Sequence, residues 1–148
     1  MISGTHTRQF IIEILSFLFV LLFVYAAFNK VIEYEKFTAQ IGQSPMLAGF
    51  GTIVPWLVIV TELAIAILFL VVKYRWLAFL LSFGLMVMFS EYIVAILNFS
   101  YYIPCSCGGI LETLGWSEHL VFNVSFVILA LAGFIFQVKS DQTKPGWL

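Results

Sequence analysis

Four long apolar stretches constrain this chain more than any other feature of its sequence. They cover residues 10–28, 53–72, 76–99 and 120–138, and each contains at most one charged side chain. About 20 mainly apolar residues are enough for a helix to cross a hydrocarbon core of about 30 Å. The sequence therefore predicts an all-α integral membrane four-helix bundle, with residues 1–148 forming a single membrane domain.

The composition excludes several other classes of protein. Hydrophobic residues make up 62% of the chain and charged residues 10%, whereas about a quarter of a typical soluble domain is charged. So few polar side chains would not cover a water-soluble core. The net charge of −1 also excludes a basic nucleic-acid binder. We therefore expect contact with membrane lipid and none with nucleic acid. The first apolar stretch is too long for the hydrophobic region of a cleaved signal peptide.

The basic residues predict how the chain is oriented in the membrane. With the N-terminus inside, five Lys and Arg residues face the cytoplasm and two, Lys30 and Lys36, face outwards. The cytoplasmic ones are Arg8, Lys73, Arg75, Lys139 and Lys144. Cytoplasmic loops carry the excess of Lys and Arg in membrane proteins. Both termini are therefore predicted to lie inside (N-in/C-in), with two connections on the outer side.

Both outer connections are predicted to contain short interfacial helices. Residues 33–41 and residues 110–114 each place apolar side chains on one face at helical spacing. Ser117 is a favourable N-cap for the last span, and Glu118 suits the positive end of its helix dipole. The outer surface is therefore predicted to consist of short helices rather than extended loops.

The two cysteines are the clearest chemical signal. Cys105 and Cys107 are the only cysteines, and they follow the third span on its outward side. Residues two apart lie at most about 7 Å from each other, and a disulfide needs Cα atoms roughly 5.5–6 Å apart, so a modest bend closes the ring. A strained ring of this kind exchanges readily. The spacing favours a redox-active pair over three alternatives: a static disulfide, inert thiols and a two-thiolate copper(I) site. We assign no metal site.

Further polar and charged residues are candidates for a functional site. His119 falls in the first turn of the last span, where the helix dipole favours a neutral imidazole that can act as a base; the alternative is an ordinary residue at a helix start. Glu62 and Glu91 are costly to bury in a membrane. Together with Lys30 and Asn29, Glu62 is expected to form a polar cluster near the outer side. Such groups either join helices by hydrogen bonds or form a quinone or proton site.

Three stretches resemble a known family. Tyr25–Phe37 combines small residues with Lys30 and aromatic side chains, Thr61-Glu62 is a polar step in the second span, and Pro104–Gly109 contains both cysteines. In these stretches the chain resembles the MauE (methylamine utilisation) branch of the DoxX-like superfamily. The resemblance implies a bundle in the bacterial inner membrane, with the interfacial helices and the cysteine loop on the periplasmic side.

The resemblance also implies a function. MauE is associated with maturation of the periplasmic methylamine dehydrogenase alongside a thioredoxin-like partner, and DoxX-like relatives are linked to quinone reduction. The implied activity is that of a thiol–disulfide oxidoreductase. It would pass electrons between a periplasmic thioredoxin-like or client protein and a quinone or membrane partner. Cys105, Cys107 and His119 would be its catalytic residues. Disulfide-forming four-helix membrane enzymes usually have two cysteine pairs, so a single pair favours a relay that needs another protein.

Two other functions stay open from the sequence. The first is a non-enzymatic membrane subunit or assembly factor of a larger complex, with Cys105 and Cys107 as a structural bridge. The second is a small-solute or metal transporter that uses Glu62 and Glu91. The sequence alone does not decide whether the chain is an enzyme.

Overall fold

The computed structural model describes residues 2–43, 47–99 and 115–142. Within these ranges the chain forms helices and turns and no strand, which confirms the all-α prediction. The four long helices are α1 (Ile2–Ile32), α3 (Ile53–Leu70), α4 (Arg75–Phe99) and α5 (Trp116–Gln142). The shorter ones are the α-helix α2 (Tyr34–Gln43) and two 3₁₀ turns, η1 (Ala48–Phe50) and η2 (Val72–Tyr74).

Four segments are long and apolar enough to cross a membrane, as the sequence predicts. They are His6–Ile32, Ile53–Leu70, Val72–Phe99 and Trp116–Gln142. The first and last are longer than the apolar stretches at 10–28 and 120–138. The difference has a physical reason: the helical backbone bonds continue into the flanking polar residues, so the apolar stretch marks only the hydrocarbon-crossing part of each helix.

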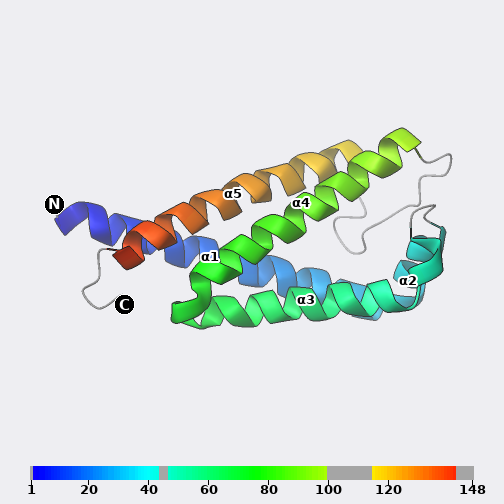
Figure 1. Cartoon of the computed structure of the whole chain (residues 1–148), viewed down its shortest axis with the longest axis horizontal. Coiled ribbons are helices and arrows are strands. Elements are labelled where there is room, and N and C mark those ends of the chain that lie inside the picture. The colour runs from blue at the N-terminus through cyan, green and yellow to red at the C-terminus, as the bar shows by residue number, and fades with distance from the viewer. Residues whose placement is uncertain (1, 44–46, 100–114, 143–148) are drawn as a thin grey trace.

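The long helices form two pairs. Helix α1 packs along α3 and α4 packs along α5, while α1 also contacts α5 and α3 also contacts α4. The start of α1, the end of α5 and the η2 turn lie at one end of the bundle, here called the η2 end (Figure 1). Helix α2 lies at the opposite end, the α2 end, where the two pairs are farther apart (Figure 1).

Phenylalanine side chains from all four long helices form the centre of the core. Phe19 of α1 stacks on Phe69 of α3 with ring centroids 5.6 Å apart. It also makes edge-to-face contacts with Phe79 of α4 at 5.9 Å and with Phe126 of α5 at 5.4 Å. Aromatic rings prefer these offset and edge-to-face geometries. The cluster joins the two helix pairs.

The outer faces of the long helices are also apolar. Phe17 is 70% exposed, Ile67 62% and Ile128 63%. A soluble monomer rarely exposes so much apolar surface, whereas lipid chains solvate it. Four apolar helices with such faces make the chain a multi-pass membrane protein in contact with lipid.

The connections agree in part with the predicted interfacial helices. Helix α2 forms where residues 33–41 predict it, and the ring of Tyr34 lies 5.3 Å from that of Trp56 on α3. The helix predicted at 110–114 lies outside the described residues. Helix α5 begins one residue before the predicted cap Ser117. The N–H of Gly115 donates to the Glu118 carboxylate, which is the return bond of a capping box and so fixes the earlier start.

Candidate functional site

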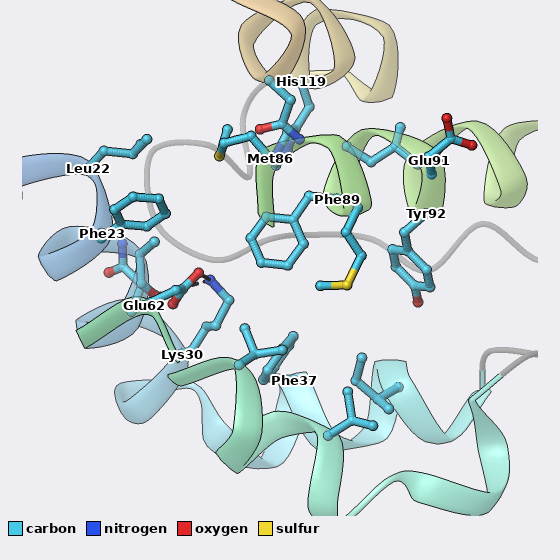
Figure 2. A pocket seen from close by; sticks show the side chains of 18 of the residues that line it. Leu22, Phe23, Lys30, Phe37, Glu62, Met86, Phe89, Glu91, Tyr92 and His119 are labelled. Carbon is cyan, nitrogen blue, oxygen red and sulfur yellow. Dashed lines mark hydrogen bonds and ion pairs between the residues drawn. The ribbon is translucent and has the colours of Figure 1, made fainter. Parts of the chain in front are cut away.

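A cavity of about 560 Å³ lies between the two helix pairs toward the α2 end. Most of the side chains that line it are apolar, and they come from all five α-helices (Figure 2). The volume is in the range of cavities that bind small organic molecules, which are also mostly apolar with a few polar groups. The polar groups of this cavity therefore indicate what it can bind.

An ion pair lies at one side of the cavity. Lys30 Nζ donates to Glu62 Oε1 over 2.8 Å, and the two side chains are only 14% and 1% exposed. The packing of α1 along α3 brings the last turn of α1 to the middle of α3, and Figure 2 shows the two side chains pointing toward each other. The rings of Phe37 and Phe89 each have their centroid 5.8 Å from Nζ. The ammonium group is thus held by a carboxylate and two aromatic rings.

Two buried polar atoms beside this pair have no hydrogen-bond partner among the described residues. They are Oε2 of Glu62 and Nδ2 of Asn29. Both residues line the cavity. A buried polar atom without a partner costs about 1–3 kcal/mol, so one acceptor and one donor are available here to a bound molecule.

A second polar group lines the cavity from α5. His119 and Asn123 are four residues apart on one helix face, and their residues are only 9% and 4% exposed. Figure 2 shows His119 across the cavity from Lys30 and Glu62. Asn123 is absent from the sequence-based site. Its spacing from His119 within an otherwise apolar helix is the signal that identifies it.

The structure brings together three of the predicted site residues. Lys30, Glu62 and His119 all line the cavity, and the expected polar cluster is present in that Lys30 pairs with Glu62. Glu91 lies at the cavity edge with an exposed side chain that points away from the ion pair (Figure 2). Cys105 and Cys107 lie outside the described residues. Among the residues that are described, no group of three His, Cys, Asp or Glu side chains is arranged to hold a metal ion.

A second ion pair lies at the η2 end, away from the cavity. Arg75 Nη1 donates to Glu13 Oε1 over 2.6 Å, and Arg75 Nε donates to the carbonyl oxygen of Phe69 over 3.1 Å. In the sequence, Arg75 is recognisable only as a basic residue predicted to face the cytoplasm. The η2 turn is short, so α4 begins directly after α3 ends. Arg75 at the start of α4 can therefore reach Glu13 in the first membrane-crossing turns of α1, and the short turn is the feature of the sequence from which this contact could be inferred.

The lining of the cavity indicates which kind of molecule it can bind. An apolar cavity that contains a buried carboxylate suits a lipid-soluble molecule with a polar head. The free Glu62 oxygen can accept a hydrogen bond, and Asn29 can donate one. The cavity therefore combines apolar volume with one acceptor and one donor.

Comparison with known proteins places the chain in a family. No curated protein and no solved structure matches the chain. The model of the family described as methylamine utilisation protein MauE matches residues 8–136, and the matched range reaches into all four membrane-spanning helices. Because this match covers most of the chain, the protein belongs to the MauE family.

Proposed function

We propose that the chain is a thiol–disulfide redox protein of the bacterial inner membrane. It would pass electrons from a periplasmic thioredoxin-like or client protein to a quinone or a membrane partner. The observation that carries this proposal is the apolar cavity with the buried Lys30–Glu62 ion pair. Ionisable side chains within membrane spans are expensive to bury and usually mark functional sites.

The position of the cysteines along the chain supports a link to this cavity. Cys105 and Cys107 belong to the segment that joins α4 to α5. Helix α5 begins at Trp116, and both Trp116 and His119 line the cavity. The first residue of the helix that follows the cysteine segment therefore lies in the cavity wall.

The proposed thiol chemistry is a two-electron exchange. A client thiolate attacks the Cys105–Cys107 disulfide and forms a mixed disulfide with one cysteine, while the other leaves as a thiolate. The second client thiol then displaces the bound cysteine. The client ends as a disulfide and the pair as two thiols, so two electrons and two protons have moved to the chain. His119 would act as the base for an attacking thiol.

A quinone, when bound, accepts two electrons and two protons. The residues present fit such a group, because the cavity holds about 560 Å³ and its buried Glu62 oxygen has no partner among the described residues. Lys30 would keep the Glu62 carboxylate in position to accept a hydrogen bond. Glu91, exposed at the cavity edge, would exchange protons with the surroundings.

Thiol trapping in membranes tests the proposal. We expect Cys107→Ser to accumulate a mixed disulfide, because the Cys105 thiolate attacks the disulfide of an oxidised client, the reverse of the exchange above, and no second cysteine of the chain resolves the adduct. The adduct is seen as a reductant-sensitive band after acid quenching and alkylation. The double variant Cys105→Ser/Cys107→Ser is the control and gives no such band. A Cys107→Ser variant without any adduct, together with unimpaired growth of the host on methylamine, would contradict a redox role. That result would support an assembly factor instead.

A further inference from the structure

Two of the apolar side chains that line the cavity are more than half exposed. Leu57 of α3 is 62% exposed and Met88 of α4 is 53% exposed. Helices α3 and α4 are joined by the η2 turn, so at 1.5 Å per residue both side chains lie roughly 20 Å along the hairpin from that turn. Because both side chains line the cavity, are well exposed and lie at one depth on facing helices, we take them to mark its opening, the mouth, between α3 and α4.

This mouth faces apolar surroundings. A point roughly 20 Å along the hairpin is still inside a hydrocarbon core of about 30 Å. The neighbouring exposed side chains are apolar as well, with Val60 58% exposed and Leu81 41% exposed. The mouth therefore opens toward lipid chains rather than toward water.

The polar atoms inside the cavity form a complementary set. Glu62 Oε1 is occupied by Lys30, and Glu62 Oε2 is a buried acceptor without a partner among the described residues. Asn29 Nδ2 is a buried donor, and it also has no partner among the described residues. Leaving both atoms unpaired costs free energy, which a ligand with one acceptor and one donor in its head would recover.

We infer that the cavity is filled sideways from the bilayer, through the mouth at Leu57 and Met88, by a lipid-soluble molecule whose head binds Asn29 Nδ2 and Glu62 Oε2. The inference rests on the proposed function in taking this molecule to be the quinone acceptor. Asn29 would donate to a ring carbonyl oxygen, and Glu62 would accept from a hydroxyl of the reduced form. The apolar remainder would lie against side chains such as Phe89 and extend through the mouth.

Binding of ubiquinone-1 to the Cys105→Ser/Cys107→Ser protein in detergent tests the inference without any thiol chemistry. Trp116 lines the cavity, so a quinone bound there quenches its fluorescence, measured as the difference from a Trp116→Phe variant.

We expect saturable quenching and about tenfold weaker binding in Asn29→Leu, the loss that corresponds to one hydrogen bond. The melting temperature of Asn29→Leu should not fall, because the amide nitrogen that it removes has no hydrogen-bond partner among the described residues. Asn98→Leu, at an exposed position outside the cavity, is the matched control and should bind normally.

The reduced form and the mouth give two further readouts. In a competition experiment, ubiquinol-1 should displace labelled ubiquinone-1 at a concentration at least tenfold lower than unlabelled ubiquinone-1 does. The reason is that a hydroxyl of ubiquinol donates a hydrogen bond to Glu62 Oε2. Leu57→Phe/Met88→Phe should slow association and dissociation at least tenfold. The control Ile67→Phe/Ile128→Phe, at exposed positions away from the mouth, should leave both rates unchanged.

The outcomes separate the two proposals. Absence of saturable quenching, or equal affinity of the starting protein and Asn29→Leu, overturns the inference even if Cys107→Ser still forms its mixed disulfide. Saturable, Asn29-dependent binding supports the inference even if no mixed disulfide forms, and in that case the thiol relay is the proposal that fails.

Discussion

Gly133 sets how closely α4 and α5 approach each other. A Cβ atom at this position would lie 2.3 Å from Cε1 of Phe79. The Phe79 ring is fully buried and packed against Phe19 and Phe69, so it has no free space into which it can move. The absence of a side chain on α5 is therefore what admits the Phe79 ring to the core.

Gly133→Ala is expected to destabilise the protein by about 1–3 kcal/mol, the usual cost of overpacking a core. The measurement is the unfolding free energy in detergent. Gly84→Ala is the matched control on α4, because a Cβ there meets nothing within 4 Å. The control should be neutral or stabilising by up to about 1 kcal/mol. Equal losses in the two variants would contradict the packing argument.

The residues of the cavity differ in how well the sequence predicts them. Lys30 and Glu62 are predictable as a cluster, because a charge within an apolar span needs a partner. Glu91, like Glu62, is the single charged residue of an apolar stretch. The sequence therefore does not tell which of the two glutamates is buried against a partner. That distinction depends on the rotation of each helix, which leaves Glu62 buried and Glu91 exposed. Asn123 is uncharged and needs no ion-pair partner, so its only signal in the sequence is its four-residue spacing from His119, and its burial shows that the side chain belongs to the cavity wall.

At the scale of elements, Arg75 joins three helices. It is the first residue of α4, its Nε donates to the Phe69 carbonyl near the end of α3, and its Nη1 donates to Glu13 of α1. The last carbonyl groups of a helix lack partners within that helix, and a cation is favourable at this end of the helix dipole. Arg75 therefore stabilises the tight turn between α3 and α4.

Arg75→Gln is expected to lower the unfolding free energy by about 2–3 kcal/mol, since it removes charge-assisted hydrogen bonds from a buried position. Glu13→Gln should cost less, under about 1 kcal/mol, because the Glu13 side chain is 51% exposed. Lys73→Gln in the same turn is the control, because Lys73 is exposed and, within the described part of the chain, its charge contacts the ring of Tyr74 and no carboxylate. Thermal unfolding of the three variants in one detergent checks this order, and a larger loss in Glu13→Gln than in Arg75→Gln would contradict it.

The elements themselves are largely predictable from apolar periodicity. The four membrane-crossing segments and α2 all form where the sequence expects them. Their ends are less predictable, because polar flanking residues such as His6 and Thr7 continue the helix without any apolar signal. The turn η1 has no periodicity at all and follows from the packing of α2 against it.

At the scale of the whole molecule, the two ends of the bundle are chemically different. The η2 end contains the Arg75–Glu13 pair and the start of α1, whereas the α2 end contains the cavity. The distribution of Lys and Arg predicts that the η2 end faces the cytoplasm. The assignment matters because only the outer side offers an environment in which disulfides persist.

Labelling of single cysteines in a Cys105→Ser/Cys107→Ser background checks the orientation. Gln43→Cys at the end of α2 should react with a membrane-impermeant maleimide in intact spheroplasts, because the α2 end is expected to face outwards. Lys73→Cys in η2 should react only after the membrane is permeabilised. Both positions are exposed, so a difference in reactivity reports sidedness. The opposite pattern would reverse the orientation and with it the periplasmic location of the native cysteines.

The separation of the two helix pairs toward the α2 end gives the bundle a wedge shape (Figure 1). A wedge occupies more area in one lipid leaflet than in the other, and a bilayer deforms at a cost to match the protein within it. Drawing the pairs together would narrow the wedge and relieve that curvature stress. We therefore expect the width of the cavity between the pairs to respond to the lateral pressure of the surrounding lipid.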